Sequence, residues 1–357
     1  MWRRKILLMD NNFSPTETFT ATSFHSNREL SGRGCSVIIV SYRTGPILIA
    51  CLRSVLVQDG LHQVILVDNG NTTKLMREVQ DLALEFSQLE ILSGHGNIGF
   101  AAACNLGAKR LSGQFMLLLN PDCVMPKNSL RMALSTFADR PDASVISVRI
   151  ENANGTEQRG GRRNLMTPWT CLVELFRLDR LAPNHPQFKR LNLNETEPHR
   201  SITVIQCTTG AFMMMRSQTY FDLNGMDEDY FLHVEDVDFC MRLAKSGGRI
   251  LYVPDIRVMH LKSTSRVSPI SIELYKTKSA IIYFRKHFKP AYSDLLLNLI
   301  IISIYSRFLV RSIPMTISWL AQKIWGLRDR RDAEVQIAAV RALEESTTVA
   351  SRTIADE

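Results

Sequence analysis

Two short segments of this 357-residue chain carry the residues best suited to chemistry. In the first, Phe115–Asp122, an apolar run ends in Asn120, Pro121 and Asp122. Because proline has no amide hydrogen to donate to a sheet, a strand formed by this run must stop before Pro121. Asp122 is therefore expected just past the carboxyl end of a buried strand, where open α/β sheets bind ligands. Its natural partner is a divalent cation carrying a nucleotide diphosphate, and an ordinary turn role is the alternative.

The second segment, Gly225–Arg242, crowds acidic residues together. They are Asp227, Glu228, Asp229, Glu235, Asp236 and Asp238. Glu235 and Asp236 are expected at the N-terminus of a helix, where the helix dipole favours carboxylates. Carboxylates this close repel one another unless a metal, an arginine or a bound proton neutralises them. The crowding makes one of these acids a candidate general base, with capping of the helix as the alternative role.

Polar residues also follow the other predicted strands. Ser41 and Tyr42 end one strand, and Asp68 ends the next. Neighbouring parallel strands lie ~5 Å apart, so these groups can line one crevice together with Asn120 and Asp122. There Asp68 can accept a hydrogen bond from a pyrimidine N–H, and the Tyr42 ring can lie against the base. A plain turn after the strand is the alternative for Asp68.

Asn97–Gly99 leads into a predicted helix over residues 100–111 that contains Asn105. A glycine at a helix entrance lets the backbone approach a ligand, and the helix N-terminus favours phosphate or ribose oxygens. We interpret Asn97, Gly99 and Asn105 as nucleotide-binding candidates. Close packing is the alternative role for Gly99.

Charge and cysteine content narrow the class of protein. A net charge of +8 and an isoelectric point near 9.2 suit acidic partners such as sugar nucleotides or anionic lipids. No interleaved basic and aromatic platform is present, so we do not expect nucleic acid as a partner. Seven cysteines without a CxxC pair argue against a disulfide framework or a zinc site. The apolar stretch Ile6–Met9 is too short for a signal peptide, which predicts a cytoplasmic protein.

Strand-like and helix-like segments alternate between residues 36 and 150. The predicted strands are residues 36–41, 63–69, 89–94, 115–119 and 145–150. This alternation predicts an α/β fold with a mostly parallel, Rossmann-like central sheet and helices on both faces. We divide the chain into a flexible leader (residues 1–34), a catalytic domain (35–270) and a C-terminal helical extension (271–357).

The extension contains two uncharged runs, Leu295–Ser306 and Ser312–Gln322, on either side of Arg307 and Arg311. Neither run reaches the ~20 apolar residues that a spanning helix needs. The pattern predicts amphipathic helices that touch anionic lipid through residues 295–326, with the basic side chains at the headgroups. Packing of the same helices on the catalytic domain is the alternative.

Together these motifs resemble the family 2 glycosyltransferases, inverting enzymes with the GT-A fold. The matching segments are VIIVSYRTGPILIACLRSVL, VILVDNGNT, GNIGFAAACNLGAK, MLLLNPDCVM, TGAFMMMR and MDEDYFLHVEDVDFCMRLAKSGGRILYVP. The bacterial rhamnosyltransferase-like branch uses the same LLLNPD, TGA and EDVD phrases. The resemblance implies transfer of a sugar from a nucleoside diphosphate sugar, with Mg²⁺ or Mn²⁺ bridging the diphosphate.

The resemblance also implies roles by position. Asp68 would bind the base, Asp122 would be the surviving aspartate of the DXD metal motif, and Asp236 would be the catalytic base. His260 falls where some relatives place a metal-ligating histidine. Asn120 replaces the first aspartate of DXD, which weakens metal binding through that side chain.

Donor and acceptor remain hypotheses. We expect rhamnose or another deoxyhexose from a dTDP-sugar, moved to a surface-glycan or lipid-linked acceptor on the inner face of the cytoplasmic membrane. Transfer from a UDP-hexose is one alternative. A catalytically silent subunit that only binds nucleotide sugar is another, suggested by the incomplete DXD motif.

Overall fold

The computed structural model describes residues 32–181, 185, 187–188, 190–194, 201–261, 267–289 and 291–324. Its strands are β1 (Gly32–Ser41), β2 (Leu61–Asp68), β3 (Leu89–Leu92), β4 (Gly113–Leu119), β5 (Cys123–Val124), β6 (Val145–Glu151), β7 (Thr203–Ile205), β8 (Phe212–Arg216) and β9 (Ile250–His260). Residues 1–31 of the predicted leader lie outside the described residues. Strand β1 begins inside the range predicted for that leader.

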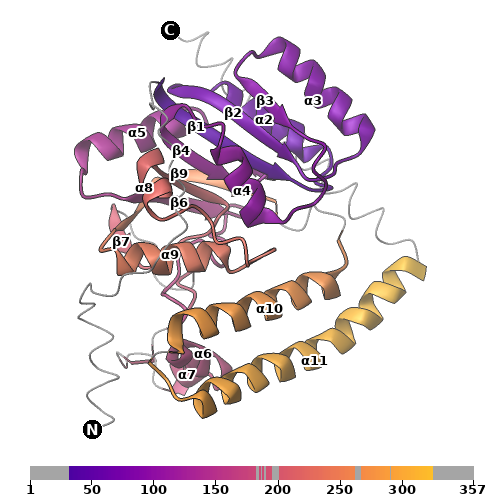
Figure 1. The fold of residues 1–357 in the computed structure, drawn as a ribbon, viewed down its shortest axis with the longest axis vertical. Coiled ribbons are helices and arrows are strands. Elements are labelled where there is room, and N and C mark those ends of the chain that lie inside the picture. Colours follow the sequence, from indigo (N-terminus) through magenta and orange to yellow (C-terminus); the bar gives the residue numbers. More distant parts are fainter. Residues whose placement is uncertain are drawn as a thin grey trace.

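The helices pack around one sheet (Figure 1). They are α2 (Ile47–Leu56), α3 (Thr73–Glu85), α4 (Phe100–Ala108), α5 (Ser129–Asp139), α6 (Pro168–Leu175), α7 (Leu178–Leu181), α8 (Ser217–Asp222), α9 (Glu235–Lys245), α10 (Pro269–Phe288) and α11 (Asp294–Ile324). The strand order is β3-β2-β1-β4-β8-β6-β9-β5, with β7 on β9. All elements predicted between residues 36 and 150 are present.

The sheet is parallel in one half and mixed in the other. Strands β3, β2, β1 and β4 run parallel, as the alternating pattern predicts. Strand β8 is antiparallel to both β4 and β6, and β5 and β7 are antiparallel to β9. Strand β6 also runs parallel to β9, so most paired residues in the sheet are parallel. The prediction of a mostly parallel sheet is therefore confirmed, and β8, β5 and β7 are its antiparallel members. The chain reaches β8 through a long connection after β6, so the helical crossover that makes neighbouring strands parallel does not apply there.

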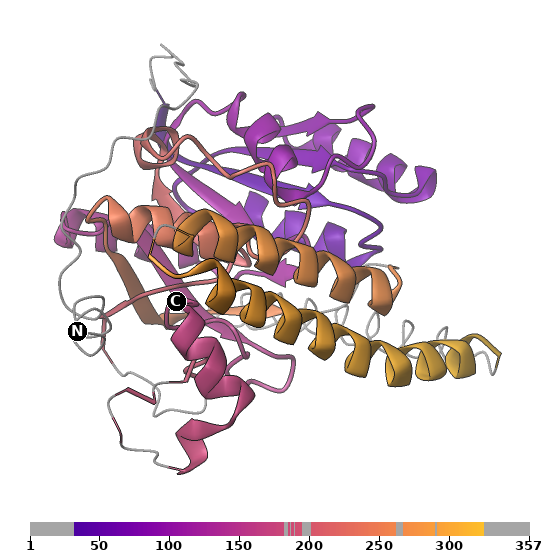
Figure 2. The same cartoon turned by 60° about the horizontal axis from the view of Figure 1, so that its bottom comes forward.

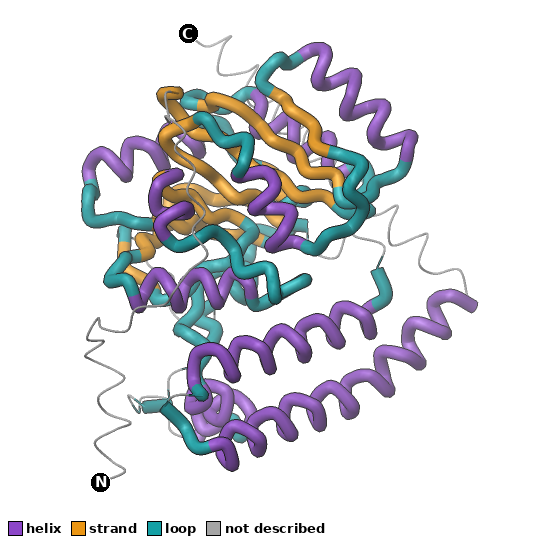
Figure 3. Tube along the Cα trace, viewed as in Figure 1, coloured by secondary structure: helices purple, strands orange, loops and turns teal. Residues whose placement is uncertain are grey.

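Two hydrophobic clusters bury the two faces of the sheet. On β1, Val37 and Ile39 belong to the cluster with α2, α3 and α5, whereas Ile38 and Val40 belong to the cluster with α4 and α9. This alternation follows from the period of two along a strand. Figure 3 shows helices on both sides of the strands. The hydrophobic core therefore fixes the strands β1, β2 and β4, whose carboxyl ends carry predicted site residues.

Helices α10 and α11 form an antiparallel pair beyond α9, and the C-terminal part of α11 extends past the N-terminal end of α10 (Figure 2). Helix α11 continues through Arg307, Arg311 and Pro314 without a break. The prediction of two separate runs, each too short to span, is therefore wrong: residues 294–321 form one helix long and apolar enough to cross a membrane, by length and composition alone. The two arginines do not break it because they turn toward α10, where both lie beside buried Glu273.

Candidate active site

Sheet register brings the predicted strand-end residues to one edge. Ser41 of β1 is paired with Asp68 of β2, and Leu119 of β4 is paired with Ile39, so Asn120 follows at the same edge. Asp68 Oδ1 accepts hydrogen bonds from the backbone amides of Gly70 (3.0 Å) and Asn71 (2.8 Å). Asp68 therefore forms the turn that was its alternative role, and binding of a base remains a prediction.

Ser41 and Tyr42 lie beside that turn. The Ser41 hydroxyl contacts Thr44 Oγ1 at 2.9 Å and the Asn71 amide nitrogen at 2.9 Å. The ring of Tyr42 lies under the guanidinium of Arg43, 5.2 Å from the ring centre. These contacts hold the end of β1 against the end of β2.

The glycine segment before α4 contacts the acidic segment directly. The amide of Gly99 donates to Asn97 Oδ1 (3.1 Å), and the amide of Phe100 donates to the carbonyl of Phe231 (2.8 Å). At φ +89°, Gly99 takes a conformation that favours glycine, and a Cβ there would lie 2.7 Å from the Phe231 carbonyl oxygen. Close packing is therefore one role of Gly99. Gly94, Gly96 and Gly99 also have the spacing GxGxxG between β3 and α4. This glycine pattern, which was not used in the sequence analysis, is typical of a turn that binds phosphate before a helix.

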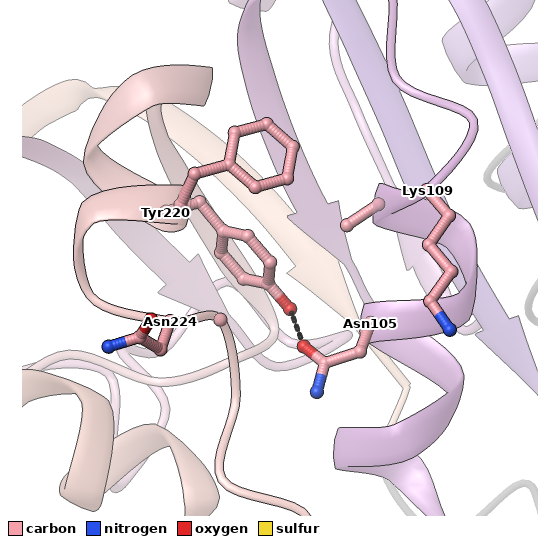
Figure 4. Close-up of a pocket in the computed structure, with 7 residues that line it drawn as sticks. Asn105, Lys109, Tyr220 and Asn224 are labelled. Atoms are coloured by element: carbon pink, nitrogen blue, oxygen red, sulfur yellow. Dashed lines mark hydrogen bonds between the residues drawn. The ribbon is translucent and has the colours of Figure 1, made fainter. Parts of the chain in front are cut away.

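Asn105 lies deeper, on the second turn of α4. Its amide oxygen accepts from the Tyr220 hydroxyl (2.6 Å) and the Met226 amide (2.9 Å), and its nitrogen donates to the Met226 carbonyl (2.8 Å). It lines a small cavity together with Tyr220 and Asn224 (Figure 4). Asn105 thus ties α4 to the start of the acidic segment, and its contact with a nucleotide remains a prediction.

Asp122 and His260 meet where β5 pairs with β9. Asp122 Oδ1 lies 3.0 Å from His260 Nε2, and Asn120 Nδ2 lies 3.3 Å from the same nitrogen. The Cys123 thiol is close by, but it donates to the Ala211 carbonyl, and burial raises its pKa well above the ordinary value. Because a thiol ligates only as thiolate, the carboxylate and imidazole are the fitting donors. The carboxylate suits Mg²⁺ or Mn²⁺, and the imidazole beside it favours a transition-metal ion such as Mn²⁺.

Asp236 is joined to the same edge through the start of β8. The Gly210 amide donates to Asp236 Oδ2 (3.2 Å), and the Asn120 amide donates to the Ala211 carbonyl (3.1 Å). Arg163 also contacts Asp236 Oδ2, at 2.6 Å, and donates to the carbonyl of Thr208. The two segments singled out in the sequence therefore belong to one site.

The backbone that leads into α9 is strained. His233 and Val234 adopt φ of +66° and +71°, in the left-handed region that a β-branched valine rarely enters. Such strain costs on the order of 1–3 kcal/mol per residue and persists only where the surroundings hold it. It turns the chain sharply, so that Glu235 and Asp236 begin α9 side by side. Burial lowers the pKa of His233 to about 4, with the positive charge of Lys276 as the next cause.

Glu235 is buried, and its surroundings keep it protonated. Burial raises its pKa to about 8, and the negative charge of Asp236 adds to the rise. Its Oε2 has no hydrogen-bond partner among the described residues. At neutral pH Glu235 is therefore an uncharged acid, whereas Asp236 beside it has Arg163 as its counter-charge.

Replacing Glu235 with glutamine is expected to stabilise the protein increasingly as pH rises. The ordinary pKa of the carboxyl is 4.5, so between pH 4.5 and about 8 the unfolded chain releases a proton that the folded protein keeps. The wild type loses stability through this window, by at most about 1.4 kcal/mol per pH unit from this group. Urea unfolding at pH 6, 7 and 8 should show Glu235→Gln gaining on the wild type. The exposed Glu78→Gln change is the control, and equal pH profiles for both variants would contradict the prediction.

Arg163 contacts Asp236 and Gln158 contacts His260, and neither of these two partners was selected from the sequence. Both come from the connection after β6, which has little regular structure and gave no periodic signal. The basic stretch at residues 159–163 was a visible sign of an anionic partner, but nothing in it identified Asp236 as that partner.

Comparison with known proteins agrees with this geometry. The model of the protein family described as "Glycosyl transferase family 2" matches residues 36–219, just over half of the chain. The rhamnosyltransferase WbbL of Escherichia coli K12 is 25% identical over 236 residues, 63% of this chain and 82% of the relative. The N-acetylglucosaminyl-diphospho-decaprenol L-rhamnosyltransferase of Mycobacterium tuberculosis H37Rv is 25% identical over 257 residues, 64% of this chain and 76% of the relative.

Among solved structures, the mannosyltransferase PcManGT of Pyrobaculum calidifontis in complex with GDP-Man and Mn²⁺ is similar at 15% identity. The match has a TM-score of 0.49 and covers 97% of this chain and 93% of that one. The polar residues at the strand ends, the acids at the start of α9 and the extent of the family match have one explanation. This chain belongs to the family 2 glycosyltransferases of the rhamnosyltransferase-like branch, and it is a transferase with a GT-A-like fold.

Proposed function

We propose that this glycosyltransferase inverts the configuration of the sugar that it moves, with Asp236 as the general base. The acceptor hydroxyl gives its proton to an Asp236 oxygen while the hydroxyl oxygen attacks the anomeric carbon. The bond from that carbon to the diphosphate breaks, and its electron pair leaves with the nucleoside diphosphate. The observation that carries the proposal is the hydrogen-bonded connection from Asp236 through Gly210 and Ala211 to Asn120 at the strand edge.

Asp122 and His260 are the proposed metal ligands. A carboxylate oxygen and an imidazole nitrogen that lie 3.0 Å apart, both nearly buried, are close enough to bind one cation together. Bound Mg²⁺ or Mn²⁺ would supply positive charge for the departing diphosphate. Ser41, Tyr42, Asp68, Asn97, Gly99 and Asn120 are the proposed nucleotide-sugar contacts. For Asn105 its surroundings support a positioning role instead.

For the donor we propose dTDP-rhamnose or another dTDP-deoxyhexose. Support comes from the two relatives named as rhamnosyltransferases. The name of the mycobacterial relative also specifies a diphospho-decaprenol acceptor, and we carry a lipid-linked glycan acceptor to this chain on that basis.

A panel of sugar nucleotides tests this proposal. The purified protein is incubated with dTDP-rhamnose, UDP-GlcNAc, UDP-galactose and GDP-mannose, each with a polyprenyl diphosphate-linked N-acetylglucosamine acceptor and Mn²⁺. Product mass should increase by one deoxyhexose with dTDP-rhamnose alone. Transfer from a UDP-hexose would establish the alternative donor class. Binding of dTDP-rhamnose with neither transfer to this acceptor nor hydrolysis of the sugar nucleotide would support the silent-subunit alternative.

We further propose that the C-terminal pair works as a peripheral membrane contact on the cytoplasmic side. One face of α11 packs inward, with Leu297 and Ile300 in the core. The opposite side presents an outer stripe of apolar side chains that are 45–73% exposed. They are Leu295, Leu299, Ile302, Leu309, Val310, Ile313, Ile317 and Leu320. A helix packed on protein along one face and apolar along the other fits the interface plane of a bilayer.

Removing the apolar character of the outer stripe is expected to abolish vesicle binding. We predict that Leu299→Gln, Leu309→Gln and Ile313→Gln together release the protein from phosphatidylglycerol–phosphatidylethanolamine vesicles in a sedimentation assay. Leu84→Gln, an exposed leucine on α3, is the matched control and should leave binding unchanged. High salt should release the wild type only in part, because Arg307 and Arg311 are already paired with Glu273. Wild-type protein that ignores these vesicles at low salt would refute the membrane contact.

A further inference from the structure

The imidazole of His260 is held from the side opposite Asp122 by a buried glutamine, Gln158. Gln158 Oε1 lies 2.6 Å from His260 Nδ1, and Gln158 Nε2 donates to the His260 carbonyl at 3.0 Å. The same nitrogen donates to Asn152 Oδ1 at 3.1 Å. The side-chain amide of Gln158 therefore forms hydrogen bonds with both the ring and the backbone of His260.

These contacts determine which way the amide faces. A backbone carbonyl only accepts hydrogen bonds, so the Gln158 atom that faces the His260 carbonyl must be the NH₂ group. The Gln158 oxygen is thereby left facing His260 Nδ1. Because that oxygen only accepts, Nδ1 must carry the hydrogen. The opposite orientation would put two carbonyl oxygens 3.0 Å apart.

When the ring is neutral, this tautomer leaves its lone pair on Nε2. That nitrogen lies 3.0 Å from Asp122 Oδ1 and 3.3 Å from Asn120 Nδ2. A cation bound to the lone pair would replace the hydrogen bond from Asn120. A nitrogen lone pair and a carboxylate oxygen this close together can serve as two ligands of one cation. The asparagine that replaces the first DXD acid thus contacts the imidazole, as a neutral hydrogen-bond donor.

Gln158 is itself held firmly. Gln158 is 3% exposed, and its backbone N–H donates to the Ile150 carbonyl at 2.8 Å. Next to it, Glu157 forms a two-point ion pair with Arg162, whose side chain is fully buried. A side chain fixed at this many points has little freedom to turn, which is what orienting a ligand requires.

We propose that Gln158 is a positioning residue that fixes the Nδ1–H tautomer of His260 and so presents Nε2 to the metal ion. The inference rests on the proposed metal site at Asp122 and His260. Hydrogen bonds of this kind to a ligating histidine are typically worth 10–100-fold in metal affinity.

The test combines a metal-binding and a spectroscopic measurement on the full-length protein. Mn²⁺ affinity is measured by electron paramagnetic resonance of the free ion, with and without dTDP, for wild type and Gln158→Met. The tautomer of His260 is read from ring ¹⁵N shifts of the metal-free protein, at a pH at which those shifts show a neutral ring, with His260→Asn used for assignment. We expect Gln158→Met to bind Mn²⁺ about 10–100-fold more weakly and to lose the Nδ1–H signature.

Gln58→Met is the matched control, because Gln58 is also buried and bonds the Pro126 carbonyl and the Leu130 amide. It should change neither readout. If Gln158→Met fails to fold, Gln158→Asn keeps an amide that is one methylene too short and should give the same two changes. An unchanged tautomer and unchanged Mn²⁺ affinity in a folded Gln158 variant would overturn the proposal. Equal Mn²⁺ binding by wild type and Asp122→Ala would instead refute the metal site, while the tautomer measurement still decides the role of Gln158.

Discussion

Replacing Asp236 with asparagine is expected to lower the rate of sugar transfer by about 10²–10⁴-fold or more while leaving nucleotide binding nearly unchanged. Asparagine can still accept from the Gly210 amide, so the start of α9 keeps its attachment to β8. What it cannot do is take the proton of the acceptor hydroxyl. Turnover in the transfer assay and dTDP affinity by calorimetry measure the two quantities separately.

Two controls make this result specific. Asp229→Asn changes an exposed acid of the same segment, which pairs with Lys286, and should leave turnover unchanged. Arg163 loses its counter-charge in Asp236→Asn, so the melting temperature of each variant must be compared with the wild type. Near-normal turnover in folded Asp236→Asn would refute its role as the base. Glu235→Gln would be tested next, although its raised pKa makes Glu235 a poor proton acceptor at pH 7.

The second large effect is expected at Asp122. Asp122→Ala removes the carboxylate that faces His260 Nε2 at 3.0 Å and leaves the proposed ion with a single protein ligand. We expect calorimetry to show that Mn²⁺ no longer strengthens dTDP binding, and transfer should fall with it, because the diphosphate loses its counter-charge.

Cys123→Ser is the matched control for this change. Its hydroxyl keeps the hydrogen bond to the Ala211 carbonyl, so the variant should bind Mn²⁺ and nucleotide like the wild type. Loss of metal binding in Cys123→Ser would make the thiol a ligand. Full activity of the wild type in excess EDTA would show that basic side chains, rather than a cation, stabilise the leaving diphosphate.

The strand-end residues illustrate how far local pattern reaches. The apolar run before Asn120 and the proline after it were enough to predict a buried strand that stops there, and β4 ends at Leu119. The helix starting at Glu235 was likewise predictable, because its apolar positions repeat at helical spacing after a cluster of acids. In both segments the signal lies within a few neighbouring residues.

The C-terminal helices show where local pattern misleads. Arg307 and Arg311 read as interruptions of an apolar stretch, yet α11 runs through both. Their charge is matched by Glu273, 34 residues before Arg307 in the chain, and only the packing of α10 on α11 brings the three together. An arginine in an apolar helix is costly when it has no counter-charge, but it is accommodated when a carboxylate lies beside it. The spacing of residues in the sequence does not reveal whether such a carboxylate is present.

The sequence alone determined the first half of the sheet, the two chemical segments and their family, because periodicity and short motifs are local properties. Only the tertiary structure decided the partners: Arg163 on Asp236, Gln158 behind His260, and the antiparallel β8 that joins the two segments. Each of these contacts depends on the connection after β6, which has no periodic pattern of its own. Its side chains acquire their roles because folding brings together residues that are far apart in the chain, such as Gln158 and His260, which are 102 positions apart.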